Sequence, residues 1–303
     1  MTHHEIVVPG SISNLGPGFD ALSVAVDVCI RVRVLDLRPS EPDAIETVFP
    51  DLAPPGENRI ETAYRRARAA FGRPAPGVRI EARSNIPVTA GLGSSAAAAV
   101  AGLLLYEALT GRCESEDLLR LACEIEGHPD NASAALLGGF TVSCLCDDGR
   151  VISRSAPWPD AVQFVVATPS SPLETVRSRA ALPATVPLRD AVFNLQRALL
   201  LLRALENGRF EDIREALRDR WHQPARTALV PCLTEALAIS HASVLGTCLS
   251  GAGSSVVALA APGRTSEAAT ELSAVYQRLN VPHTIRILSA HQPAGARTLQ
   301  HTL

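Results

Sequence analysis

The stretch that most constrains this chain is PVTAGLGSSAAA, which runs from Pro87 to Ala98. It predicts a strand end, a glycine loop and a long helix, because residues 96–109 are mostly strong helix formers and Gly111 follows them as a stop. Gly91 and Gly93 have no Cβ, so the loop can turn sharply and an anion can approach its backbone. This loop is therefore the first candidate binding site of the chain.

Ser94 and Ser95 stand where the N-cap residues of this helix are expected. The free N–H groups of the first turn and the positive end of the helix dipole together form a phosphate site. The loop has no GK[ST] triplet and no lysine, so it is not a Walker loop. An Ala/Gly-rich helix start selected only for close packing is the alternative, and the other motifs of the chain argue against it.

Length and composition exclude several classes of protein. A chain of 303 residues is long enough for two domains, and a formal charge of −3 without a long basic run argues against nucleic-acid binding. The seven cysteines form no CxxC pair, which favours reduced thiols over disulfides or a zinc site. The N-terminus has no signal-peptide pattern, and the longest apolar run, Ala96 to Tyr106, is too short to span a bilayer. We therefore expect a cytoplasmic protein without membrane or nucleic-acid partners.

The pattern of apolar residues predicts an α+β fold with largely antiparallel sheets, because strands and helices do not alternate strictly. Residues 5–8 are predicted as an edge strand that Pro9 stops, and residues 38–57 as a loop. Further strands are predicted at 31–37, 78–82, 140–146, 163–168, 256–260 and 284–288, and further helices at 59–71, 116–126, 175–181, 188–206, 210–220, 233–241 and 266–279. Pro157 and Pro159 mark a domain boundary.

Three separated motifs resemble the signatures of one superfamily, the GHMP small-molecule kinases. They are SNLGPGFD (Ser13–Asp20), PVTAGLGSSAA (Pro87–Ala97) and LGTCLSGAGSS (Leu245–Ser255). Each motif alone is weak evidence. All three, in order and across nearly the whole chain, are strong evidence.

Further stretches are similar to the homoserine kinases within that superfamily. They are EGHPDNASAALLGGF (Glu126–Phe140), TVRSRAALPATVPLRDAVFNLQRA (Thr175–Ala198) and RWHQPARTALVP (Arg220–Pro231). The chain departs from the usual pattern at five positions, which bear on fine substrate fit rather than on the class of enzyme. Ala225 replaces a tyrosine, Cys232 a glycine and Ser254 a proline, and Ser133 and Ala134 differ from the usual VAP.

The resemblance implies a two-domain α+β GHMP-kinase fold. Residues 1–158 would form a ribosomal-protein-like, ATP-binding domain with a left-handed crossover, and residues 159–303 a ferredoxin-like domain, with the substrates in the cleft between them. The implied activity is that of an ATP:L-homoserine phosphotransferase of threonine biosynthesis, which uses ATP and Mg²⁺ and forms a homodimer. A GHMP kinase for a different small alcohol and a catalytically inactive regulatory homologue are the alternatives.

The resemblance also assigns residues to ATP and magnesium. Ser95 and Glu124 would hold the magnesium ion, with Glu126 as a rival and a solvated helix carboxylate as the alternative for Glu124. Asn58 matches an adenine-contacting position, although a plain helix N-cap explains it nearly as well. The residues expected around ATP are Asn58, Pro87, Gly91, Leu92, Gly93, Ser94, Ser95 and Ala96.

The acceptor site follows from the groups that homoserine carries. Asp20, with Asn14 beside it, suits the ammonium, and Arg179 and Arg226 suit the carboxylate because guanidinium groups bind it bidentately. Thr175 lies one helical turn before Arg179 and can add a hydroxyl contact. A turn aspartate and surface arginines are the alternatives for these charged residues.

Asn131 is expected to contact the hydroxyl that reacts. Several relatives have a catalytic aspartate near this segment, whereas the homoserine kinases have an asparagine, and an amide cannot accept the hydroxyl proton. We therefore expect direct in-line attack, with the proton passing to phosphate or water. His128 as a general base is the second possibility, and a structural histidine that holds the loop is favoured over it.

Overall fold

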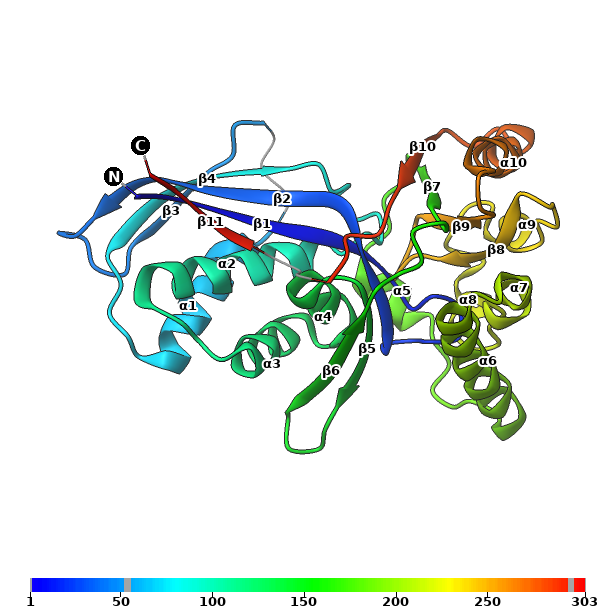
Figure 1. Ribbon diagram of the computed structural model, residues 1–303, viewed down its shortest axis with the longest axis horizontal. Helices are drawn as coiled ribbons and strands as arrows, with labels where there is room; N and C mark the ends of the chain where they lie inside the picture. Colours follow the sequence, from blue (N-terminus) through cyan, green and yellow to red (C-terminus); the bar gives the residue numbers. More distant parts are fainter. Residues whose placement is uncertain (1, 52–55, 294–296, 303) are drawn as a thin grey trace.

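The structure, a computed structural model, describes residues 2–51, 56–293 and 297–302, and it contains two β-sheets (Figure 1). The seven-stranded sheet consists of β1 (Thr2–Ser13), β2 (Leu22–Arg38), β3 (Ile45–Val48), β4 (Gly77–Ser84), β5 (Phe140–Leu145), β6 (Val151–Ala156) and β11 (Arg297–Thr302). The four-stranded sheet consists of β7 (Phe164–Pro169), β8 (Val244–Leu249), β9 (Val256–Ala260) and β10 (His283–Leu288).

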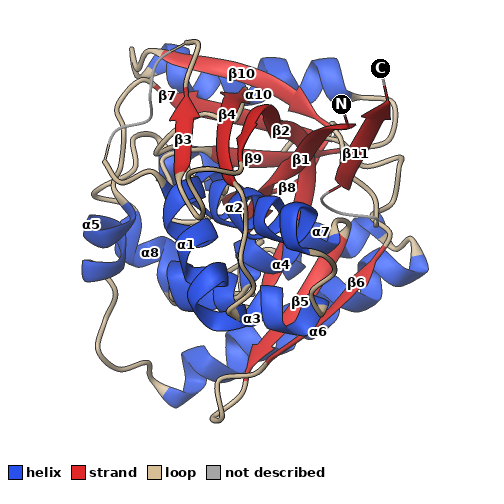
Figure 2. Cartoon of the chain, turned by 90° about the vertical axis from the view of Figure 1, so that its left-hand side faces the viewer, coloured by secondary structure: helices blue, strands red, loops and turns tan. Residues whose placement is uncertain are grey.

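Ten α-helices accompany these sheets in the described part of the chain. They are α1 (Arg59–Phe71), α2 (Ser94–Thr110), α3 (Ser115–Glu126), α4 (Asp130–Leu137), α5 (Thr175–Ala180), α6 (Leu188–Asn207), α7 (Ile213–Ala216), α8 (His222–Arg226), α9 (Leu233–Leu237) and α10 (Thr265–Arg278). Figures 1 and 2 show α1 to α4 gathered on one side of the larger sheet. Figure 1 shows α5 to α10 in the half of the molecule that contains the smaller sheet. No helix in the described ranges is both long and apolar enough to cross a membrane.

The sheets are largely antiparallel, as the sequence predicts. The larger sheet has the order β11-β1-β2-β4-β3, and the first residues of β2 also pair with β5, which pairs in turn with β6. The smaller sheet has the order β10-β7-β9-β8. Among the pairs that the structure describes, only β3 and β4 run parallel. The result is an α+β fold with two sheets.

Helix α2 is buried on nearly every side, which explains why its sequence shows no polar face. Ten of its residues are buried, and most of them are alanine, glycine or leucine. Small side chains let its neighbours approach closely, because a Cβ on Gly102 would lie 2.1 Å from the carbonyl oxygen of Ile60 in α1. The buried helix holds the glycine loop at a fixed place beneath the larger sheet.

The structure confirms some of the helices and strands predicted from the sequence and differs from the prediction at others. Helix α1 and strand β9 have the predicted bounds. Strand β1 is not an edge strand that Pro9 ends: it runs on to Ser13 between β2 and β11, and Pro9 lies at a shift in register. Strands β3, β6, β8 and β11 were not predicted. The helices expected at 210–220 and 233–241 shorten to α7 with a 3₁₀ turn at Phe210–Asp212 and to α9.

The chain passes from the larger sheet to the smaller one between Ala156 and Phe164, which is where the prolines suggested a boundary. It then returns, because β11 pairs with β1 in the larger sheet. Figure 1 shows the two chain ends side by side. The predicted second unit, residues 159–303, therefore contains a strand that belongs to the first sheet.

Candidate active site

The three sequence motifs lie against one another and are joined by hydrogen bonds. Gly251 N donates to the carbonyl of Ser13 at 3.1 Å, Ser11 N, just before the first motif, donates to the carbonyl of Leu92 at 3.0 Å, and the side-chain Oγ of Ser250 donates to the carbonyl of Gly91 at 2.6 Å. Segments far apart in the sequence thus form one framework. A cavity of about 800 Å³ opens against it, and residues of both domains line this cavity.

The glycine loop turns sharply into α2 as predicted, and its glycines have a further role that the sequence did not indicate. Gly91 and Gly93 have φ values of +76° and +69°, in the left-handed region. A Cβ on Gly91 would lie 2.2 Å from the carbonyl oxygen of Ser250, and a Cβ on Gly93 would lie 2.2 Å from Ser11 Oγ. The glycines thus permit close packing of the loop on other protein segments, while the other side of the loop lines the cavity.

The N-cap of α2 is Gly93, so the expectation that Ser94 and Ser95 are caps is corrected. They are the first two residues of the helix instead. The backbone N–H groups of a first helical turn have no partner within the helix, and the dipole is positive at this end. Because Ser94 and Ser95 line the cavity, these donors are available to an anion.

The carboxylate near Ser95 is that of Glu126 and not that of Glu124. Ser95 Oγ donates to Glu126 Oε1 at 2.7 Å, and both residues line the cavity. Glu124 is exposed and forms an ion pair of 2.6 Å with Arg120. Two residues rotate a helix by roughly 200°, so only one of the two glutamates can face the loop. The geometry therefore favours Glu126, the rival residue, over the predicted Glu124 as the partner of Ser95.

Glu126 also has the electrostatics of a cation ligand. Burial raises its pKa, and the hydrogen bond from Ser95 opposes this effect without cancelling it. No arginine forms an ion pair with Glu126 in the described part of the chain. Hydroxyl and carboxylate oxygens are the ligands that Mg²⁺ prefers. The residues present therefore fit a magnesium ion, which Ser95 and Glu126 would hold.

One end of the cavity is apolar, a feature that the sequence alone did not indicate. Its side chains come from β2, β4, α1 and the loops that follow β3 and β4, and they include Ile30, Phe49, Ile60, Ala82 and Ile86. Asn58 lies at this end as the N-cap of α1, and its Oδ1 accepts from the backbone N–H groups of Ile60 and Glu61 at 3.2 and 3.4 Å. An apolar slot next to a phosphate loop suits a nucleobase.

The opposite end of the cavity is charged. Arg179, on α5, donates twice to the carboxylate of Asp20, with distances of 2.6 and 3.0 Å. Asn14 holds the loop of Asp20, because its Oδ1 accepts from Asp20 N at 3.0 Å and its Nδ2 donates to the carbonyl of Gly251 at 2.9 Å. Thr175, at the start of α5, lines the same end. The predicted substrate residues therefore lie together.

Arg226 is a buried cation without an acidic partner. Arg226 is 1% exposed, and its guanidinium donates to His222 Nδ1 at 3.0 Å and to the carbonyl of Gly251 at 3.3 Å. No carboxylate lies within ion-pair distance of it among the described residues, although it lines the cavity. Burial lowers the pKa of Arg226 to about 10, and the charge of Arg179 adds to this effect. A bound anion would supply the missing charge.

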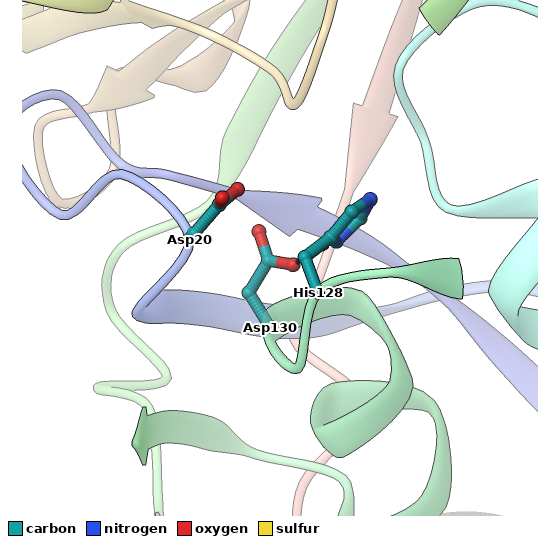
Figure 3. A group of neighbouring side chains, drawn as sticks. All are labelled: Asp20, His128 and Asp130. Atoms are coloured by element: carbon teal, nitrogen blue, oxygen red, sulfur yellow. Dashed lines mark hydrogen bonds and ion pairs between the residues drawn. The ribbon is translucent and has the colours of Figure 1, made fainter. Parts of the chain in front are cut away.

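His128, in the turn between α3 and α4, and Asp130, at the start of α4, lie close to Asp20 of the N-terminal loop (Figure 3). His128 Nδ1 lies 2.5 Å from Asp130 Oδ1, and ligand atoms of Asp20, His128 and Asp130 lie within 4.8 Å of one another. Such a group could hold a metal ion, but each of its members already has a partner within the protein. Burial lowers the pKa of His128, yet the hydrogen bond and charge of Asp130 outweigh it and raise that pKa overall.

Asn131 follows Asp130 on α4, and its orientation is set by Ser11, a residue that the sequence did not single out. Ser11 Oγ donates to Asn131 Oδ1 at 2.7 Å, so the carbonyl side of the amide is occupied. The amide nitrogen is 3.5 Å from Asp130 Oδ1, at the limit of a hydrogen bond, and Asn131 lines the cavity. Asn131 can thus offer an N–H to an oxygen in the cavity.

The remaining predicted ATP residues divide into two groups. Pro87 and Leu92 line the cavity, whereas Ala96 does not and points into the core. The chain contains no lysine, so every permanently charged cation that lines the cavity is an arginine. Besides Arg179 and Arg226, these are Arg59 and Arg83.

A glycine loop at a helix N-terminus, a serine–glutamate pair and a charged acceptor pocket in a two-domain α+β fold define a small-molecule kinase. The models of the GHMP kinases N terminal domain and of the GHMP kinases C terminal domain match residues 58–139 and 201–278. The chain therefore belongs to the GHMP kinase family.

Within this family its relatives are homoserine kinases. The homoserine kinase of Thermus thermophilus is 40% identical over 271 residues, which cover 89% of this chain and 91% of the relative. That of Moorella thermoacetica is 38% identical, with 93% and 95% of the two chains covered. A crystal structure of homoserine kinase from Cytophaga hutchinsonii matches with a TM-score of 0.83 at 25% identity and covers 98% of this chain and 97% of its own. The galactokinase of Lactococcus lactis, at 15% identity and a TM-score of 0.74, shares the fold and covers 98% of this chain and 95% of its own.

Proposed function

We propose that this chain transfers the γ-phosphoryl group of ATP to the side-chain hydroxyl of L-homoserine, forming O-phospho-L-homoserine in threonine biosynthesis. The observation that carries the proposal is that one cavity combines a glycine loop at a helix N-terminus with a buried, unpaired arginine next to an acid–arginine pair. The first feature suits a triphosphate and the second an amino acid. Relatives named homoserine kinase, at 35–42% identity, support the same assignment.

The nucleotide would lie along the cavity from its apolar end to the glycine loop. The adenine would occupy the slot near Phe49 and Asn58, and the phosphates would accept hydrogen bonds from the N–H groups at the start of α2. Ser95 and Glu126 would hold the magnesium ion, which neutralises charge on the phosphates when it is bound. The protein thereby contributes position and electrostatics to the reaction.

The acceptor would displace the ion pair between Asp20 and Arg179. Its ammonium would take the carboxylate of Asp20, and its carboxylate would take Arg179 and Arg226, so that each charge released is paired again. Thr175 would add a hydroxyl contact. A zwitterion satisfies both groups at once, whereas a molecule with a single charge leaves one of them without a partner.

The transfer itself would be a direct in-line displacement. The hydroxyl oxygen forms a bond to the γ-phosphorus as the bond to the bridging oxygen breaks, ADP leaves, and the hydroxyl proton passes to a phosphoryl oxygen or to water. The Asn131 amide N–H would orient the attacking oxygen. The raised pKa of His128 keeps it protonated over a wider pH range, which argues against it as the general base.

The test is a kinase assay with homoserine, mevalonate, shikimate and galactose as acceptors. We expect turnover with homoserine to exceed the others. We also expect 4-hydroxybutyrate, which lacks the ammonium, and 3-aminopropan-1-ol, which lacks the carboxylate, each to lose at least about tenfold in kcat/KM. Preference for another alcohol would point to a different GHMP kinase, and no turnover with any alcohol to an inactive homologue.

We also propose a cytoplasmic homodimer. The supporting observation is a row of exposed apolar side chains on α6, Leu188, Val192, Leu195 and Leu199, whose 4-3-4 spacing lets two copies of the helix pack together. Sedimentation of the unmodified chain and of Leu195→Glu tests it. A dimer that becomes a monomer in the variant is expected, and a monomeric unmodified chain would refute it.

A further inference from the structure

His222 is a fully buried histidine that makes a hydrogen bond with each ring nitrogen. It begins α8 and lies one helical turn before Arg226. Its Nε2 is 2.6 Å from the carbonyl oxygen of Gly16, and its Nδ1 is 3.0 Å from Arg226 Nη1. The first bond leads to the N-terminal loop and the second to the charged end of the cavity.

The two partners determine the tautomer of the ring. A carbonyl oxygen only accepts, so Nε2 carries the hydrogen; a guanidinium only donates, so Nδ1 is the acceptor. Burial lowers the pKa of His222, and the charge of Arg226 acts in the same direction while Asp219 and the more distant Asp20 oppose it. The His222 ring is therefore neutral, with its hydrogen on Nε2 and its acceptor nitrogen, Nδ1, facing Arg226.

Asp219 does not compete for the ring hydrogen, although its Oδ2 lies 3.6 Å from Nε2. Its carboxylate already accepts from Asn194 Nδ2 at 2.6 Å and from the backbone N–H groups of Trp221 and Gln223 at 2.8 and 2.6 Å. The carboxylate instead fixes the start of α8. The hydrogen bond from His222 to Gly16 therefore ties the ring to the N-terminal loop.

The loop that Gly16 belongs to also carries Asp20. A Cβ on Gly16 would lie 2.3 Å from the carbonyl oxygen of Leu217, so this loop packs tightly against the second domain. Phe19, in the same loop, has its ring 5.3 Å from that of His222 and 5.4 and 5.5 Å from the guanidinium carbons of Arg179 and Arg226. Any displacement of His222 would therefore change the position of Arg226 relative to Asp20.

We infer that His222 is a positioning residue that fixes Arg226 at a set distance from Asp20, and thereby sets the spacing between the carboxylate-binding and ammonium-binding groups of the acceptor site. The inference rests on the proposed function, because it concerns how that site recognises an amino acid. His222 itself does not line the cavity, and it acts through Arg226.

Two substitutions separate the two bonds. In His222→Asn the amide oxygen lies near the position of Nδ1 and can accept from Arg226, whereas in His222→Gln the longer side chain can donate to Gly16 but loses that acceptor. We expect His222→Gln to raise the KM for homoserine at least about tenfold with the KM for ATP within about twofold. We expect a smaller rise in His222→Asn, because Arg226 keeps its acceptor although the bond to Gly16 is lost. His283→Gln is the matched control, since His283 also bonds through both nitrogens in the second domain but outside the cavity.

An unchanged KM for homoserine in His222→Gln, an equal rise for ATP, or equal effects of Gln and Asn would overturn the inference. If the Gln variant does not fold, the ¹⁵N shifts of the unmodified protein still test it: a neutral Nε2–H ring at pH 7 is expected, and an Nδ1–H or doubly protonated ring refutes it. Absence of homoserine turnover in the unmodified chain would instead be a failure of the proposed function.

Discussion

Glu126 and Arg226 are opposite charges that burial affects in opposite directions. Burial raises the pKa of Glu126 and lowers that of Arg226 to about 10, because a buried environment penalises the charged form of each group. Each side chain therefore gains most from a ligand of the opposite charge. A cation bound at Glu126 and an anion bound at Arg226 would each offset the free-energy penalty of burying the charge.

The first prediction compares the two glutamates. Glu126→Gln should lower kcat at least about a hundredfold with little change in the KM for homoserine, because it removes a carboxylate ligand of the charge-neutralising cation. Glu124→Gln should stay within about twofold, since that carboxylate faces solvent and Arg120. Steady-state kinetics at saturating Mg²⁺ measure both variants. A large loss of kcat in Glu124→Gln, together with an unchanged kcat in Glu126→Gln, would contradict the assignment of Glu126.

At the scale of elements, the glycine loop depends on what packs behind it. Gly93 and Gly72 have nearly the same φ, +69° and +66°, but a Cβ on Gly93 would meet Ser11 Oγ whereas nothing lies within 4 Å of one on Gly72. The two positions therefore share the backbone strain of a left-handed residue and differ in steric contact. Comparison of the two isolates the contribution of packing.

The second prediction uses this contrast. Gly72→Ala should cost about 1–2 kcal/mol of unfolding free energy, the strain of an L-residue in this region. Gly93→Ala should cost more and also weaken ATP binding, because the loop must move away from Ser11. Urea unfolding and nucleotide titration measure the two effects. In Ser11→Ala/Gly93→Ala, part of the stability should return, and equal costs at Gly93 and Gly72 would exclude the steric explanation.

Elements with local signals were predictable and those with distant partners were not. Helix α1 has the predicted bounds because Asn58 caps its start and Gly72, in the left-handed conformation, ends it. The sequence could not decide between Glu124 and Glu126, because it does not fix which side of α3 faces the loop. Ser11 and His222 were missed because their partners, Asn131 and Gly16, lie 120 and 206 residues away.

At the scale of the whole molecule, the C-terminal segment joins the two sheets. After β10 in the smaller sheet, His291 N donates to the carbonyl of Ala25 at 2.8 Å, and the carbonyl of His291 accepts from Gly139 N at 2.7 Å. Strand β11 then pairs with β1. The cavity lies where both domains meet, so the return of the chain helps to hold the two halves of the site together.

The third prediction tests this connection by deletion. A chain without residues 294–303 loses the pairing of β11, and a chain without 289–303 also loses the hydrogen bonds at Ala25 and Gly139. We expect Tm to fall in both chains and further in the second, which should also bind ATP and homoserine less tightly. Calorimetry and ligand titration measure the effects. Equal Tm values for the two shortened chains would show that residues 289–293 contribute nothing.

The last prediction concerns pH, because two histidines, the buried His222 and the half-buried His128, make opposite contributions to the free energy of unfolding. Burial lowers the pKa of His222, so below about pH 6.5 the unfolded chain binds a proton at this residue that the folded chain does not bind. The free energy of unfolding should therefore decrease as the pH is lowered below this value. The pKa of His128 is raised overall, because Asp130 outweighs burial, so its contribution is full below about 6.5 and is lost as pH rises through the folded pKa. The free energy of unfolding is measured with urea between pH 5 and 8.5. Its dependence on pH should become weaker on the acid side in His222→Asn and on the alkaline side in His128→Gln, whatever the overall stability of each variant. If His222→Asn leaves the acid slope as it was, this histidine does not stay neutral in the folded protein.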